Sequence, residues 1–127
     1  MEKEFEFRID MQQRTKQFAL RVIKLFQALP KTDEAIIIGK QLLRSATSVG
    51  SNYRAACRAR SPKEFYSKLS IVVEEADEAM FWIELLAEST ILKATLLQDL
   101  LNENEEIIKI VVSARKKYQQ NQNKQTE

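Results

Sequence analysis

Histidine is absent from this 127-residue sequence, and glycine and proline supply only two residues each. Without histidine, the chain lacks the commonest general base, the Ser-His-Asp and Cys-His nucleophile systems, and the ligands of nearly all zinc and di-iron sites. An all-β sandwich or barrel needs turn residues roughly every 8–12 positions, so the scarcity of glycine and proline excludes that class. The single Cys57 cannot form an internal disulfide and fits a reducing compartment, so we expect a cytoplasmic protein.

Long apolar runs are also missing, and we expect no targeting segment. No run approaches the roughly 18 apolar residues of a membrane span, and Met1–Asp10 is acidic, unlike a signal or transit peptide. Twenty basic and eighteen acidic residues give a net charge of +2, which does not by itself indicate a nucleic-acid partner. Because there is no nucleophile–base pair, metal-ligand set or phosphate-binding glycine loop, we expect no enzymatic activity, no cofactor and no metal. Because there is no membrane-spanning apolar run, we expect no membrane partner.

Turn signals divide the chain into four amphipathic segments. Pro30 ends the first segment, and Thr32 or Asp33 is a good N-cap for the second. Ser61-Pro62-Lys63-Glu64 is a capping box with proline at the first helical position. We predict helices at about residues 10–29, 33–59, 62–88 and 94–118. Short connections between long helices favour antiparallel neighbours, so the predicted fold is all-α, an antiparallel up-down-up-down four-helix bundle over residues 10–118.

The two ends of the chain are predicted to lie outside the bundle. In residues 1–9, Phe5, Phe7 and Ile9 alternate with charged residues, which indicates either a short extended arm or a disordered segment. We favour a partly ordered arm that packs on the bundle. Residues 119–127 carry no apolar side chain, so we expect a disordered, solvated tail.

The second segment separates into distinct faces at 100° per residue. Its predicted core face is Leu42, Ala46, Val49, Tyr53 and Ala56. Gly39 and Gly50 lie along one flank and are small enough to let another helix approach closely. Each glycine costs about 1 kcal/mol relative to alanine inside a helix, and close packing is the expected compensation.

Charge is strongly segregated along the chain. Between Lys40 and Lys68 there are seven basic residues and one acidic residue, a net charge of +6; between Glu74 and Glu106 there are ten acidic residues and one lysine, a net charge of −9. The basic residues are interpreted either as phosphate contacts or as ion-pair partners of the acidic face, within one subunit or across a subunit interface. The candidates for nucleic-acid contact are Arg54, Arg58, Arg60, Lys63 and Lys40. Arg44 is expected to be structural, paired with Glu75 or Glu78.

Apolar residues of the third segment indicate self-association. Phe81 and Leu85 lie nearly opposite the predicted core face of this segment, with Trp82 and Ile71 beside them. Aromatic residues ringed by charge are typical of a protein interface. We therefore predict an oligomer interface at Phe81, Trp82, Leu85 and Ile71; the alternative is that Phe81 lies under the N-terminal arm.

Two further sets of residues favour structural interpretations. The carboxylates of the third segment lack the Glu-x-x-His pattern with which helical bundles bind two iron ions, so we do not expect a metal site. Cys57 lies near Arg54 and Arg58, which favour a reactive thiolate. Its place on the flank of small residues favours buried packing instead.

A family resemblance rests on the run Gln41-Leu42-Leu43-Arg44-Ser45-Ala46-Thr47-Ser48-Val49, followed by Asn52, Ser61–Phe65, Leu69, Glu75 and Glu78. These positions resemble the four-helix-bundle family of proteins encoded in intervening sequences of 23S rRNA genes. The same superfamily includes the accessory variability protein of diversity-generating retroelements. The sequence departs from the family pattern after Asn52, where Tyr53-Arg54-Ala55-Ala56 adds positive charge to the second helix.

The resemblance implies an up-down bundle that assembles into a homopentameric ring. For the retroelement branch it also implies binding to a reverse transcriptase and to RNA or DNA through a basic surface. We therefore expect a non-enzymatic oligomeric platform that contacts structured RNA, or an RNA–protein complex such as a reverse transcriptase with its template. The alternative is a structural or protein-partner module without nucleic-acid binding, whose charges serve ring assembly.

Overall fold

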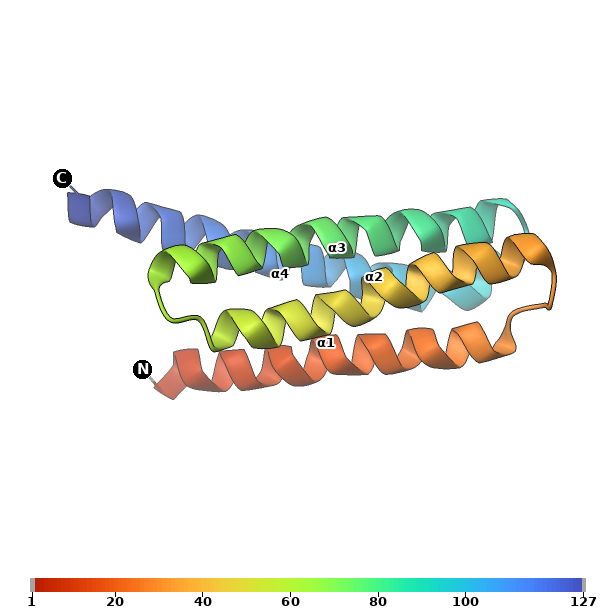
Figure 1. Cartoon of the computed structure of the whole chain (residues 1–127), viewed down its shortest axis with the longest axis horizontal. Helices are drawn as coiled ribbons and strands as arrows, with labels where there is room; N and C mark the ends of the chain where they lie inside the picture. The colour runs from red at the N-terminus through yellow and green to blue at the C-terminus, as the bar shows by residue number, and fades with distance from the viewer. Residues whose placement is uncertain (1, 127) are drawn as a thin grey trace.

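Four α-helices account for nearly all of the molecule. The structure is a computed structural model, and it describes residues 2–126, without the side chains of residues 122 and 124–126. The helices are α1 (Glu2–Ala28), α2 (Asp33–Cys57), α3 (Pro62–Glu88) and α4 (Ala94–Thr126), and residues 2–126 contain no strand. The α1–α2 and α3–α4 connections lie at one end of the molecule, and the α2–α3 connection lies at the other, beside both termini (Figure 1). The prediction of an all-α, four-helix protein is confirmed.

Side-chain caps set the first residues of the two middle helices. Thr32 has an extended backbone and its side chain accepts a hydrogen bond from the Ala35 N–H, while Ser61 does the same for the Glu64 N–H at 3.1 Å. Pro62 occupies the first turn of α3, where its missing N–H costs nothing. Both helices begin where the sequence predicted.

The connection between α3 and α4 turns without glycine. Thr90 adopts a φ of 58°, the left-handed region that glycine usually occupies at the end of a helix. The Thr90 N–H donates to the Ala87 carbonyl at 3.1 Å, and the Leu92 N–H donates to the Leu86 carbonyl at 3.3 Å. These bonds satisfy carbonyls that the last turn of α3 would otherwise leave open.

One face of every helix contributes to a single core. All five predicted core residues of α2 are buried, from Leu42 to Ala56. The largest side chains that are fully buried are Phe18, Leu42, Leu69, Ile83, Leu86, Leu97 and Ile107. Burying side chains of this size stabilises the fold by about 1.5–3 kcal/mol each.

Two polar contacts fix how α4 lies against its neighbours. Asn104 is fully buried; with its amide oriented to satisfy both polar atoms, it donates to the Ala76 carbonyl at 3.1 Å and accepts from the Met80 N–H at 2.9 Å. Arg14 of α1 donates to both carboxylate oxygens of Glu103, at 2.7 and 2.8 Å, which raises the pKa of the guanidinium. Both contacts depend on one register of α4, since a slip by one residue would turn these side chains away.

Both predictions for the ends of the chain are wrong. The chain is helical from Glu2, not an arm separate from the bundle, because Phe7, Met11 and Thr15 continue the helical spacing of α1 toward the N-terminus. Helix α4 continues to Thr126, whereas a disordered tail was predicted over 119–127. The cause is propensity: glutamine and lysine are good helix formers, and no glycine or proline interrupts the segment. Residues 1 and 127 lie outside the described part of the chain.

Candidate nucleic-acid interface

The candidate site is built where α2 ends and α3 begins. Arg54 lies in the last turn of α2, Arg58 is its C-cap residue, and Arg60 and Lys63 lie in the connection and in the first turn of α3. All four side chains are exposed. Lys40 is also exposed, but it lies 14 residues before Arg54 on the same helix, about 21 Å away at 1.5 Å per residue. The structure therefore brings four of the five predicted residues together and leaves Lys40 apart.

These basic side chains form few ion pairs with acidic residues of the same chain. The only ion pair that any of them makes within residues 2–126 joins Arg60 to Glu64, at 3.9 Å. That pair is between two residues four apart on the surface, where such contacts contribute at most about 0.5 kcal/mol. Arg54, Arg58 and Lys63 make no ion pair in the described part of the chain. Ion pairing within one subunit therefore does not account for the basic residues at this end of the molecule.

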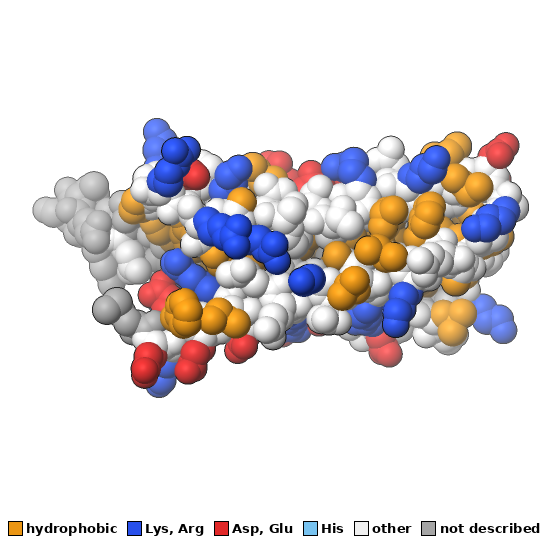
Figure 2. Space-filling view, turned by 60° about the horizontal axis from the view of Figure 1, so that its bottom comes forward, with side chains coloured by type: hydrophobic (Ala, Val, Ile, Leu, Met, Phe, Trp, Pro, Cys, Tyr) orange, Lys and Arg blue, Asp and Glu red, His pale blue; other side chains and the backbone are white. Residues whose placement is uncertain are grey.

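Helix α1 extends the same positive surface. Lys16 and Arg54 line one shallow pocket of about 190 Å³ between α1 and α2. Figure 2 shows the face over these two helices: Lys and Arg side chains spread across its middle, while Asp and Glu side chains lie along its margins. We use the name basic surface for Lys16, Arg54, Arg58, Arg60 and Lys63.

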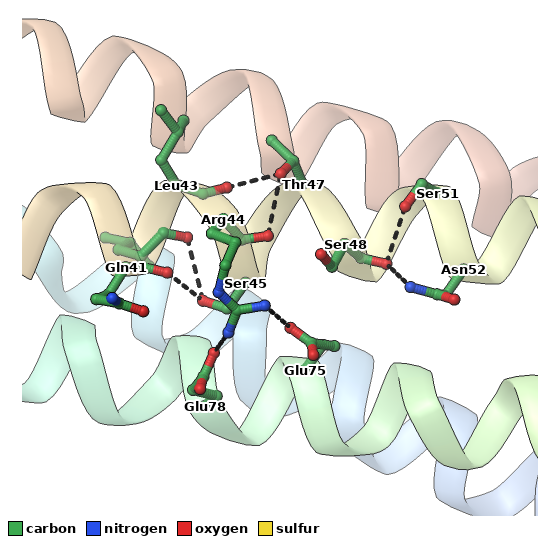
Figure 3. Close-up of polar contacts among 11 residues, drawn as sticks. Gln41, Leu43, Arg44, Ser45, Thr47, Ser48, Ser51, Asn52, Glu75 and Glu78 are labelled. Carbon is green, nitrogen blue, oxygen red and sulfur yellow. Dashed lines mark hydrogen bonds and ion pairs between the residues drawn. The ribbon is translucent and has the colours of Figure 1, made fainter.

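Arg44 has a different role from the other arginines of α2. Its guanidinium contacts Glu75 at 3.2 Å and also hydrogen-bonds to Glu78, so it joins α2 to both carboxylates that the sequence offered as alternatives (Figure 3). Because all three side chains are partly exposed, solvent screens both ion pairs, and their contribution to stability is modest. What it does provide is a fixed register between α2 and α3.

The small polar residues of the run Gln41–Asn52, which carries the family resemblance, form hydrogen bonds within their own helix. Ser45 donates to the Gln41 carbonyl at 3.1 Å, Thr47 donates to the Leu43 carbonyl at 2.8 Å, and the Asn52 amide donates to the Ser48 carbonyl at 2.9 Å (Figure 3). These donors are therefore already used by the backbone. The segment acts as a packing surface, and the charged residues after it carry the candidate function.

The predicted oligomer interface is a partly exposed apolar patch on α3. Phe81 is 52% exposed and its ring packs edge-on against Trp82, with 4.9 Å between ring centroids. Within residues 2–126, α1 makes no close contact with α3, so the alternative that Phe81 lies under an N-terminal arm is wrong for the described part of the chain. Leu85 and Ile71 are half-buried. The Trp82 Nε1 donor is buried and finds no acceptor within residues 2–126.

Cys57 is half-buried beside Tyr53. Burial raises the pKa of the Cys57 thiol, although a hydrogen bond with Tyr53 and the charges of Arg8 and Arg58 act in the opposite direction. Burial also raises the pKa of the Tyr53 hydroxyl. A raised pKa lowers the fraction of thiolate at neutral pH, so burial works against activation of this thiol.

Sequence reasoning missed a groove formed by both ends of the chain. It holds about 1090 Å³ and lies between the start of α1, the α2–α3 connection and the last turns of α4. Its walls include Lys3, Phe7, Arg8, Lys109 and Tyr118, none of which was a predicted site residue. The signal was present in the sequence: on a helix, Lys3 and Phe7 share one face. Assigning residues 1–9 to an arm concealed it.

The described residues form neither a metal site nor a membrane-spanning helix. Among the described residues, no group of three or more Cys, Asp or Glu side chains is arranged to hold a metal ion. None of the helices, over the part of the chain described, is long and apolar enough to cross a membrane.

Comparison with known proteins points to one family. The family model described as 23S rRNA-intervening sequence protein matches residues 8–113. A solved structure from Bacteroides thetaiotaomicron, described as a protein with unknown function from the S23 ribosomal protein family, is similar with a TM-score of 0.80 and 32% sequence identity. The similarity covers 86% of this chain and 97% of that one. No curated protein matches the chain at a significant level.

Proposed function

This chain belongs to the 23S rRNA-intervening sequence protein family, and from that premise we propose that it is a non-enzymatic platform that binds structured RNA through its basic surface. The partner is RNA alone or an RNA–protein complex, such as a reverse transcriptase with its template. The proposed place of action is the cytoplasm. The resemblance first seen in the run from Gln41 to Val49 is thus confirmed as family membership, whereas the binding function is our proposal.

The observation that carries the proposal is the exposed pair Arg54 and Arg58. They are four residues apart at the end of α2, so they lie on one face about 6 Å apart along the axis. Neither makes an ion pair within residues 2–126. A guanidinium presents a planar fork that donates two parallel hydrogen bonds to phosphate oxygens. Two such forks on one helical turn suit successive phosphates of a nucleic-acid backbone.

The surrounding charges favour an extended anion over a small one. Lys16 of α1 lines a pocket with Arg54, and Lys63 lies in the first turn of α3, so the basic surface draws on three helices. The acidic excess, a net charge of −9, belongs to the residues between Glu74 and Glu106. This segregation leaves the basic surface with a strong local field although the whole chain carries only +2.

Assembly completes the proposed platform. We propose that antiparallel four-helix subunits form a homopentameric ring, with Phe81, Trp82, Leu85 and Ile71 at the subunit contacts. The half-exposed Phe81 ring supports this, since large aromatic side chains at the surface are typical of interfaces. A ring repeats the basic surface around its axis, and several weak contacts then act together on one RNA.

The test is reversal of the two central charges. Arg54→Glu combined with Arg58→Glu should abolish binding of a structured RNA and leave the oligomer mass unchanged. Lys24→Glu combined with Lys93→Glu is the matched control, because it changes the net charge by the same −4 at exposed positions outside the basic surface. RNA binding is measured by fluorescence anisotropy and mass by light scattering.

Two results would contradict the proposal. Equal loss of binding in both double variants would mean that overall charge, not the basic surface, attracts RNA. Loss of the oligomer in the Arg54 and Arg58 variant would make these arginines assembly residues, and it would favour a structural or protein-partner module instead.

A further inference from the structure

The groove at the end of the bundle combines two kinds of lining. We call it the open-end groove; residues of all four helices and of the α2–α3 connection line its volume of about 1090 Å³. It exists because α1 and α4 approach each other least among neighbouring helices, while Arg14 and Glu103 hold them together farther along. This volume is slightly larger than the range of about 300–1000 Å³ that is usual for ligand sites.

Aromatic side chains from three helices contribute to the apolar lining. Phe7 from α1, Phe65 from α3 and Tyr118 from α4 all line the groove. Tyr118 packs edge-on against Phe65 with 6.0 Å between centroids. The Arg8 guanidinium lies 4.8 Å above the Phe65 ring, which stabilises both side chains in place. Phe7 remains 42% exposed, so its ring is available to a ligand.

The charged side chains of the groove are almost all positive. They are Lys3, Arg8, Arg60, Lys109 and Lys117, with Glu4 as the single acidic residue. Arg8 lies 3.4 Å from Glu4, Lys109 lies 3.5 Å from Glu105, and Arg60 lies 3.9 Å from Glu64. Lys3 and Lys117 make no ion pair within residues 2–126, so the groove keeps cations free for an anionic ligand.

Aromatic rings beside free cations are the arrangement that binds single-stranded nucleic acid, in which bases stack on rings and phosphates contact lysine and arginine. We propose that the open-end groove binds unpaired nucleotides, with bases stacked on Phe7 and Tyr118 and phosphates held by Lys3 and Lys117. A duplex hides its base faces, so this ligand is distinct from the duplex parts of an RNA. This inference rests on the proposed function, because both assume an RNA partner. Arg60 belongs to the basic surface and also lines the open-end groove.

Charge complementarity supports this occupant. The ligand must carry repeated negative charge to match the lysines and flat apolar groups to match the rings, and a single strand supplies both at every nucleotide. An acidic amphipathic helix is the competing occupant; it would need apolar contact but no stacking. The test therefore separates binding that depends on base stacking from binding that depends on charge alone.

The experiment compares two oligomers of equal charge on the full-length protein. A labelled ten-nucleotide oligoadenylate and an abasic oligomer of the same length are titrated and followed by fluorescence anisotropy. The first variant is Phe7→Ala, and its matched control is Phe5→Ala, because Phe5 is an exposed aromatic of the same helix that does not line the groove. The second pair is Lys117→Glu with Lys116→Glu as control, since only Lys117 lines the groove.

Phe7→Ala should weaken oligoadenylate binding about fivefold or more, as expected for loss of one stacked base. Phe5→Ala should bind as the unmodified protein does, and the abasic oligomer should bind weakly and be insensitive to Phe7→Ala. Lys117→Glu should weaken both oligomers, and Lys116→Glu should weaken them less.

Equal effects of Phe7→Ala and Phe5→Ala, or equal affinity for the two oligomers, would overturn the inference. Duplex RNA is titrated in parallel, because its binding depends on Arg54 and Arg58. Duplex binding without oligoadenylate binding overturns only this inference and points to the helical occupant. Failure to bind either RNA overturns the proposed function as well.

Discussion

The two glycines of α2 form a matched pair that tests how closely α1 packs on it. A Cβ on Gly39 would lie 2.5 Å from Leu29 Cδ1 and 2.9 Å from Phe26 Cδ2. A Cβ on Gly50 would lie 3.5 Å from its nearest neighbour, the Thr15 carbonyl oxygen. Alanine is favoured over glycine inside a helix by about 1 kcal/mol, and this gain applies at both positions. Only at Gly39 must neighbouring side chains move, and overpacking costs about 1–3 kcal/mol.

We therefore expect Gly50→Ala to raise the free energy of unfolding by about 1 kcal/mol. Gly39→Ala should leave it unchanged or lower it by up to about 2 kcal/mol, the overpacking cost less the propensity gain. For a chain of this size, 1 kcal/mol shifts Tm by about 4 °C. Urea and thermal unfolding followed by circular dichroism, at matched protein concentration, measure both variants. If Gly39→Ala proves as stable as Gly50→Ala, the close packing described at Gly39 is wrong.

Three further predictions concern assembly, the core and the thiol. Phe81→Glu should reduce the oligomer mass in light scattering, and an unchanged mass would remove Phe81 from the interface. Asn104→Asp should approach normal stability below about pH 4, where a protonated carboxyl replaces both amide hydrogen bonds. Burial raises the pKa of that carboxyl above its unfolded value, so stability should be lost as the pH rises, and equal urea stability at pH 4 and 7 would contradict this. Because burial raises the pKa of the Cys57 thiol, iodoacetamide at pH 8 should modify the native protein more slowly than the urea-unfolded chain; mass spectrometry showing equal rates would refute it.

Helix boundaries were predictable where a side chain caps the backbone. Ser61 with Glu64, and Thr32 before α2, are local signals, because the capping atoms lie within three residues of the N–H that they satisfy. No side-chain cap of this kind marks the start of α1 within residues 2–126. There the alternation of Phe5, Phe7 and Ile9 resembled a strand, and only the helical spacing from Phe7 to Met11 indicated the helix.

The candidate site was predictable only in part, for a similar reason. Arg54 and Arg58 share a turn of one helix, so sequence spacing alone places them on one face. The open-end groove joins residues from opposite ends of the chain, such as Phe7 and Tyr118, which line one groove only because α1 and α4 are neighbouring helices. Asn104 was missed because an amide within an apolar stripe gives no local sign that it bonds to the backbone of another helix.

RNA affinity across a salt series tests the central claim most directly. Each duplex phosphate that the protein neutralises releases counterions and adds about −0.9 to the slope of log affinity against log salt. The nuclease-treated protein, titrated with a labelled structured RNA, should show a slope of about −3 or steeper, since Arg54, Arg58, Arg60 and Lys63 supply four exposed cations per chain. A flat slope, or no binding at low salt, would contradict the account and assign the basic surface to contacts with protein partners.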